Sequence, residues 1–190
     1  LKRYDSFEPG TMDHAAYGVK VLFDEGMIRR FLPDDKWDSI IYTAIAHHSD
    51  YELPEISDPQ TLLHAKLIRD EDKLDNCRVK LVDSTSTFIN VSEEELGTQN
   101  ITQKVYETVF ENKCILSADR VTQTDYWVSY IVYFFDINFK ESFDIIAEND
   151  YLNRIIDRIP YSNPVTKEQM ENIRVYMQNF INSHTNSQSF

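Results

Sequence analysis

Three histidines and one aspartate are the side chains in this sequence best suited to hold a metal ion. His14 lies near the start of the chain, His47 and His48 are adjacent, and Asp72 lies in the acidic segment RDEDKLDN. Imidazole and carboxylate groups together suit divalent metals such as manganese, iron, nickel and zinc. If three helices bring them together, these four residues are candidate ligands of a shared site.

His14 also has a structural alternative, as a capped or hydrogen-bonded core residue. His14 precedes Gly18 by four residues, and the missing side chain of that glycine would let another helix or a ligand approach closely. His47 and His48 point about 100° apart on a helix, so both reach one site only if it lies at the helix end. The acidic loop SDYELP follows them directly.

The acidic segment itself has a second interpretation, as the solvent-facing side of a helix. Like charges at helical spacing repel by about 0.2–0.5 kcal/mol per pair, and charge runs usually face solvent. At about 100° per residue, Asp72 lies on the opposite side of the helix from a leucine stripe. That stripe, which we expect to be the buried face, contains Leu63, Leu67, Leu74 and Leu81.

The 190-residue chain carries a net charge of -13, from 32 acidic and 19 basic residues. This charge repels phosphate backbones and argues against bulk nucleic-acid binding. The two cysteines, Cys77 and Cys114, match no zinc spacing and suit reduced core residues of a cytosolic protein. Because no apolar run approaches the roughly 18–20 residues that span a bilayer, we expect a cytoplasmic protein without membrane contact.

Helical periodicity dominates the sequence and predicts an all-α fold. Only four glycines and six prolines interrupt it, and no alternating strand pattern with Asn-Gly or Asp-Gly turns appears. We expect a single-domain helical bundle of about seven helices. The predicted helices span about residues 12–24, 34–48, 59–82, 101–111, 125–136, 140–159 and 166–183, with a short helical turn at 93–95 and one broken or two short helices in 140–159.

The predicted helix at 125–136 is apolar almost all round, which is typical of a buried helix. Trp127, Tyr130 and Phe134 recur at spacings of three and four residues. We expect these rings to be core residues and not a platform on which bases stack.

The order of these elements resembles the HD-domain phosphohydrolase superfamily over roughly residues 4–82. The aromatic segment YWVSYIVYFFDINF, residues 126–139, is similar to the C-terminal helical part of bacterial members. The resemblance implies an all-α fold that binds one to three divalent metals. It is carried by DHAAYGVKVLF (residues 13–23), AIAHHSDYELP (44–54) and AKLIRDEDKLDNCR (65–78).

The family pattern implies roles for individual residues of this sequence. Asp72 matches the terminal metal-binding aspartate of the family. Stringent-response alarmone hydrolases carry a similar segment, ADRLHN, whose arginine and asparagine align with Lys73 and Asn76. Cyclic-dinucleotide phosphodiesterases have a histidine with glycine four residues later, and a His-His pair, similar to those here. The implied metal ligands are Asp72, His14, His47 and His48, the implied catalytic residues are His14, Arg69 and Lys73, and the implied substrate contacts are Arg69, Lys73 and Asn76.

The activity implied by the resemblance is hydrolysis of phosphomonoesters, phosphodiesters or nucleotides. Its cofactor would be a divalent ion, of manganese, iron, nickel, zinc or magnesium, and its partner a phosphorylated small molecule or a nucleotide. Such an ion lowers the pKa of a bound water to about 7 and so supplies hydroxide near neutral pH. A Ser or Cys nucleophile finds little support, because no strand-turn-helix elbow occurs.

The sequence departs from the family in one respect, the defining His-Asp doublet. That doublet should precede His14, but none of the five histidines is followed by aspartate. We therefore expect residues 1–82 to form an N-terminally incomplete HD-like core, with residues 83–190 packed on it and a polar tail at 183–190. Because Asp72 is the only predicted ligand of the primary metal, we expect weak or absent metal binding and poor hydrolysis. A non-catalytic HD-like binding or regulatory module is the alternative.

Overall fold

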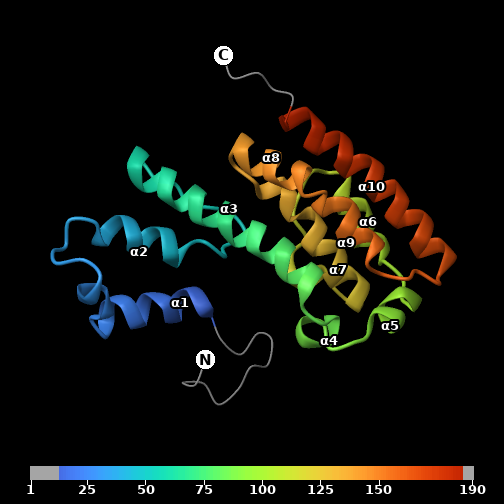
Figure 1. Cartoon of the computed structure of the whole chain (residues 1–190), viewed down its shortest axis with the longest axis horizontal. Coiled ribbons are helices and arrows are strands. Elements are labelled where there is room, and N and C mark those ends of the chain that lie inside the picture. The colour runs from blue at the N-terminus through green and yellow to red at the C-terminus, as the bar shows by residue number, and fades with distance from the viewer. Residues whose placement is uncertain (1–12, 186–190) are drawn as a thin grey trace. The chain divides into compact units, whose positions relative to one another are not determined.

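The computed structural model describes residues 13–185, and this part of the chain is helical without a strand (Figure 1). The predicted all-α class is confirmed, whereas an HD-type arrangement stays a prediction. The described part contains more helices than the predicted seven. Short helices occur in segments predicted to be connections, and the segment 140–159 forms two separate helices. The helices are α1 (His14–Val19), α2 (Asp38–Ala46), α3 (Pro59–Val82), α4 (Thr85–Phe88), α5 (Glu93–Thr98), α6 (Gln103–Val109), α7 (Gln123–Val132), α8 (Lys140–Glu148), α9 (Tyr151–Asp157) and α10 (Pro164–Thr185).

The chain divides within α3 into two compact units, residues 1–69 and 70–190. Sequence analysis places the end of the first part at residue 82, so the observed division comes earlier, inside the long helix. The buried contacts change partners at this point. Arg69 donates hydrogen bonds to the turn that follows α2, whereas Asp70 accepts them from the residues that precede α8.

The first unit begins with a helix that changes its winding. The carboxylate of Asp13 caps α1 by accepting the N–H of Ala16 at 3.0 Å, and a π-helical turn, η1 (Lys20–Asp24), continues it. Gly26 then adopts the left-handed conformation, with φ of 72°, before the short 3-10 helix η2 (Met27–Arg30). The predicted helix over residues 12–24 is therefore present across the described part of that range, but only its first half is α-helical.

Helix α2 starts later than the acidic residues in front of it predict. The carboxylate of Asp34 accepts the N–H of Lys36 at 3.2 Å, and such local bonds offer the backbone an alternative to the helix. In the first unit, α1 and α2 pack against each other (Figure 1). Few apolar side chains are buried in the described part of this unit: Ala15, Val19, Ile28, Ala44 and Ala65.

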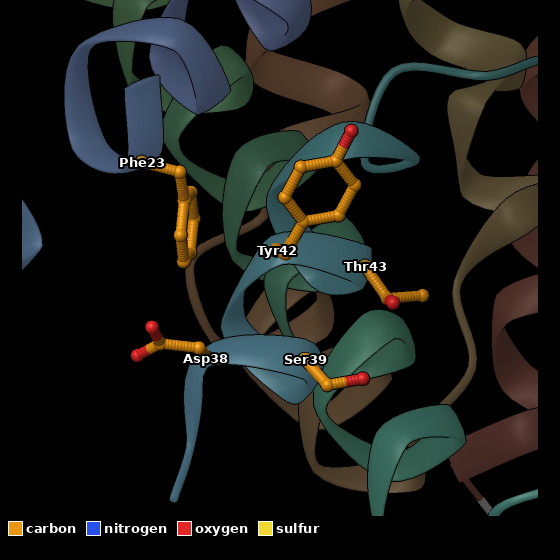
Figure 2. Close-up of a pocket in the computed structure, with 5 residues that line it drawn as sticks. All are labelled: Phe23, Asp38, Ser39, Tyr42 and Thr43. Carbon is orange, nitrogen blue, oxygen red and sulfur yellow. The ribbon is translucent and has the colours of Figure 1, made fainter. Parts of the chain in front are cut away.

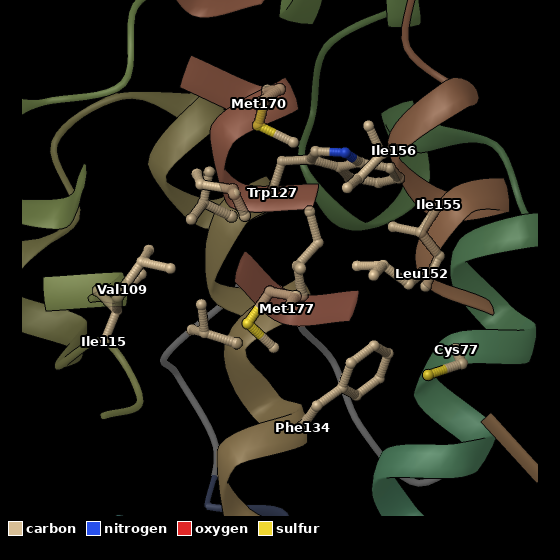
Figure 3. Close-up of a cluster of buried hydrophobic side chains, with 14 of the residues drawn as sticks. Cys77, Val109, Ile115, Trp127, Phe134, Leu152, Ile155, Ile156, Met170 and Met177 are labelled. Atoms are coloured by element: carbon tan, nitrogen blue, oxygen red, sulfur yellow. The ribbon is translucent and has the colours of Figure 1, made fainter. Parts of the chain in front are cut away.

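The second unit is built on one continuous hydrophobic core (Figure 3). Helix α10 packs on α8 and α9, and α7 contributes side chains with no exposed surface. The buried members labelled in Figure 3 are Cys77, Val109, Ile115, Trp127, Phe134, Leu152, Ile155, Ile156, Met170 and Met177.

Helix α7 is the aromatic helix that the sequence predicts as buried. A capping box starts it: Thr122 accepts the N–H of Asp125, and the Asp125 carboxylate accepts the N–H of Thr122. Trp127 and Phe134 are buried, as expected, whereas Tyr130 is half-buried. The helix also ends earlier than predicted, because residues 133–136 wind as a 3-10 turn.

The prediction that the leucine stripe is the buried face of α3 is wrong for the first half of the helix. Leu63 and Leu67 are 51% and 46% exposed, although Leu74 and Leu81 pack against the core of the second unit. The buried positions instead carry mostly charged side chains, which are allowed because partners elsewhere in the fold satisfy them. These positions are Ala65, Arg69, Asp70, Lys73, Cys77 and Lys80.

Asp70 shows how such a charge is satisfied. Its carboxylate accepts the backbone N–H groups of Asn138 at 2.9 Å and Phe139 at 3.0 Å, and the Asn138 side-chain amide at 2.9 Å. These residues directly precede α8, whose first N–H groups have no partner within the helix. Asp70 is therefore a fold determinant that ties α3 to the start of α8, and not a solvated charge.

Candidate histidine site

Two of the predicted ligands meet in the first unit. The Nε2 atoms of His14, at the start of α1, and His48, just after α2, lie 2.8 Å apart, with the rings edge to face. Gly18, one turn after His14, permits this approach, because a Cβ there would lie 3.3 Å from the Cγ2 of Ile45 on α2. The close helix contact inferred from Gly18 is thus present, and it brings the two imidazoles together.

The backbone fixes which nitrogen of His48 carries a proton. Its Nδ1 lies 2.8 Å from the carbonyl oxygen of Ile45, and a carbonyl can only accept a hydrogen bond. Nδ1 must therefore donate, so the neutral ring presents the lone pair of Nε2 to His14.

His47 is oriented in the same way by a carboxylate. Its Nδ1 lies 2.6 Å from the Oδ2 of Asp50, three residues later. The Nδ1 proton is held by this pair, which leaves Nε2 as the acceptor in the neutral ring. Histidines that bind metal usually donate their other N–H to a carbonyl or a carboxylate in this manner.

Arg69 holds the turn that carries both histidines. It is 1% exposed, and its NH1 donates to the carbonyl oxygens of His47 at 3.0 Å, His48 at 3.3 Å and Asp50 at 2.7 Å. Three carbonyls gathered on one charged donor fix the backbone after α2. These contacts make Arg69 a positioning residue, and the substrate contact implied for it stays a prediction.

The other predicted site residues lie in the second unit. Lys73 is 7% exposed and its Nζ lies 2.7 Å from the Oδ2 of Asp136. The side-chain amide of Asn76 donates to the carbonyl oxygen of Asp72 at 2.9 Å and reaches its Oδ2 at 3.4 Å. Lys73 and Asn76 are thus engaged with neighbouring acids, and their contact with substrate stays a prediction.

The residues fit a metal ion in part. The Nε2 atoms of His14 and His48 lie 2.8 Å apart, which is the length of a hydrogen bond between two imidazoles. Two nitrogens that each lie about 2.0–2.1 Å from one tetrahedral ion are about 3.3 Å apart, so the two rings would have to separate by about 0.5 Å to share an ion. Among residues 13–185, however, no three His, Cys, Asp or Glu side chains are grouped so as to hold an ion. The role of Asp72 as a metal ligand stays a prediction.

A separate hollow opens on the first unit (Figure 2). It has a volume of about 320 Å³, and part of its wall is formed by the rings of Phe23 and Tyr42, which pack edge to face with their centres 5.3 Å apart. Asp38, Ser39 and Thr43 complete its lining. None of the predicted site residues lines this hollow, so it is distinct from the histidine pair.

Sequence reasoning missed Asp50 as a site residue, and it assigned Arg69 to the site without its contacts to the backbone. Asp50 carried a usable signal, since an acid three residues after a histidine can bond to it across one turn. The contact from Arg69 to the backbone had no such signal, because its acceptors are carbonyl groups and not side chains.

No family model, curated protein or solved structure matches the chain. Within residues 13–185, none of the helices combines the length and apolar character that crossing a membrane requires. The candidate site therefore depends on the geometry of its own residues.

Proposed function

We propose that the chain acts as a metal-dependent phosphohydrolase of the HD-domain type, with His14 and His48 as metal ligands in the first unit. Asp72, in the second unit, is retained as a proposed metal ligand from the sequence pattern. The observation that carries the proposal is the Nε2 pair at 2.8 Å, in which the Ile45 carbonyl turns the lone pair of His48 toward its partner.

The protein residues have separate tasks in this proposal. When bound, the metal supplies hydroxide near neutral pH by lowering the pKa of water. His14 and His48 provide neutral nitrogen ligands, and Arg69 holds the turn that carries His47 and His48. His47, held by Asp50 at 2.6 Å, presents Nε2 as a proton acceptor. Once Nε2 has taken up a proton from water, the ring can donate that proton to the leaving oxygen as a general acid.

A non-catalytic binding or regulatory module is the second candidate. It is favoured by the engagement of the cationic side chains within the fold, since Arg69 donates to carbonyl groups and Lys73 pairs with Asp136. Such a module would bind a phosphorylated small molecule or a nucleotide without turning it over.

The experiment measures metal-dependent phosphate release by the chain. Mn²⁺, Ni²⁺, Zn²⁺ and Mg²⁺ are supplied one at a time with p-nitrophenyl phosphate, bis(p-nitrophenyl) phosphate and nucleotides. We expect slow hydrolysis that Asp72→Asn or His48→Gln lowers by at least about a hundredfold, because each change removes a proposed metal ligand.

Two matched changes serve as controls. Asp75→Asn alters an exposed acid on the same helix, which pairs with Arg78 at 2.8 Å, and His64→Gln alters an exposed histidine of α3. Both variants should keep the rate of the parent chain. No release with any metal, or equal loss in the control variants, would count against the hydrolase and leave the binding module.

A further inference from the structure

Arg120 is a half-buried arginine in the second unit, and within residues 13–185 its hydrogen bonds and ring contact are made with uncharged side chains. It follows the short 3-10 helix η3 (Ser117–Asp119). Its NH2 lies 2.5 Å from the hydroxyl of Ser117 and its NH1 lies 3.5 Å from that of Ser129, while the guanidinium covers the ring of Tyr126 at 4.5 Å. Its Nε is buried without a hydrogen-bond partner.

The other half-buried arginines of this unit show what Arg120 lacks. Arg158 pairs with Glu93 at 2.8 Å, and Arg174 pairs with Asp157 at 2.5 Å and with Glu171 at 3.0 Å. In the part of the chain that the structure describes, no carboxylate forms an ion pair with Arg120, not even that of its neighbour Asp119. An uncompensated guanidinium is notable in a chain with 32 acidic residues.

Arg120 hydrogen-bonds to the hydroxyl groups of Ser117, Ser129 and Tyr133. Burial raises the pKa of Tyr130 to about 12, and burial also raises the pKa of Tyr133, with the charge of Arg120 acting in the opposite direction on both. Both phenols therefore keep their protons near neutral pH and can donate hydrogen bonds. The charge of Asp72 also raises the pKa of Tyr133.

We propose that Arg120, with the hydroxyl groups of Ser117, Tyr130 and Tyr133, binds a phosphate-type anion. A guanidinium presents several donors in a fixed plane that matches phosphate oxygens, and the hydroxyls add neutral donors. That this anion is the phosphoryl group of the substrate rests on the proposed function. Anion binding by itself does not require a metal or turnover.

The test is a titration of the metal-free chain with inorganic phosphate, against chloride at matched ionic strength. NMR follows the Nε–H signals of the arginines and the ring signals of the tyrosines. We expect a saturable shift of Arg120 and of Tyr130 or Tyr133, and a phosphate-dependent rise in melting temperature.

Arg120→Gln should weaken phosphate binding by at least about tenfold, because a hydrogen-bonded charge pair is lost. Arg120→Lys keeps the charge but loses the planar donor geometry, so its phosphate affinity should lie between that of the parent chain and that of Arg120→Gln. Arg78→Gln removes the same charge from an exposed arginine of this unit and should bind like the parent chain.

An absent or non-saturable shift in the parent chain would overturn the proposal, and so would equal affinity in Arg120→Gln. The parent titration remains informative even if a variant fails to fold. This titration is independent of the hydrolysis assay, so the two results can be compared. Phosphate binding in a chain that shows no turnover would support this anion site and reject the proposed function. Turnover in a chain that does not bind phosphate would reject this anion site and support the proposed function.

Discussion

The two units of this chain are stabilised by different means. The second unit buries a continuous apolar core around Trp127 and Phe134, whereas the described part of the first buries only a few side chains, three of them alanines. The first unit depends visibly on polar contacts, including the cap at Asp13 and the hydrogen bonds of Arg69. The histidine pair lies in the unit with the thinner core.

This difference has a consequence for how the site behaves. Regions with few buried apolar contacts open locally at lower free energy than well-packed cores, and binding sites are often drawn from them. We expect the backbone of α1 and α2 to exchange amide hydrogens faster than that of α7. A ligand that joins His14 to His48 would slow this exchange in the first unit.

Removing one tryptophan from each unit should give the largest contrast. Trp127→Ala deletes a fully buried ring and should lower the free energy of unfolding by about 3–5 kcal/mol. Trp37→Ala makes the same change at a half-buried position of the first unit and should cost much less. Urea denaturation followed by circular dichroism measures both, and equal losses would contradict the difference in cores.

The second-largest loss of stability is expected when the buried carboxylate of Asp70 is removed. Asp70→Asn removes the charge that accepts three N–H groups around the start of α8 and should cost about 3 kcal/mol. Asp75→Asn, on the exposed side of the same helix, should change stability by less than about 0.5 kcal/mol. If the two variants unfold at the same urea concentration, Asp70 is not a determinant of the second unit.

Lys80 should give the second unit a characteristic pH dependence. Its ammonium lies 4.1 Å from the ring centre of Phe88 and 4.0 Å from that of Tyr130, and burial lowers the pKa of Lys80 from 10.5 to about 8. Below pH 8 the folded and unfolded states both hold the proton. Between about pH 8 and 10.5 the unfolded state holds more, so this group makes the native state more stable as the pH rises.

Lys80→Met should abolish that contribution. The difference in unfolding free energy between the variant and the parent should change by about 2 kcal/mol from pH 7 to 9.5. Comparing the two chains at each pH removes the opposite contribution of Cys77, whose pKa is raised by burial to about 12. A constant difference across this range would show that Lys80 titrates as an exposed lysine does.

The smallest effect on stability is expected where α1 meets α2. Gly18→Ala gains helix propensity, worth up to about 1 kcal/mol, but its Cβ would lie 3.3 Å from Ile45. We expect the gain in helix propensity and the crowding against Ile45 nearly to cancel, so that the melting temperature changes little. The same change should still move the imidazole signals of His14 and His48, and unchanged signals would mean that this contact does not set their spacing.

The sequence predicts what periodicity and local chemistry can encode. The all-α class, the long helix α3 and the burial of Trp127 follow from patterns within a single segment, and Gly18 correctly indicated a close helix contact. The leucine stripe gave a wrong prediction of the buried face of α3, because an argument from periodicity places charged residues in solvent. Asp70 meets its partners Asn138 and Phe139 far along the chain, and no local pattern reveals such a pair.

The most direct test of the histidine site is a zinc titration of the isotopically labelled chain, followed by the ring-nitrogen signals of its histidines. We predict weak binding in which the Nε2 signals of His14 and His48 move together, while those of His64 stay in place. His48→Gln should abolish the shift of His14, and His64→Gln should leave it intact. If zinc moves neither signal, or moves His14 equally in His48→Gln, the pair is a structural contact and not a metal site.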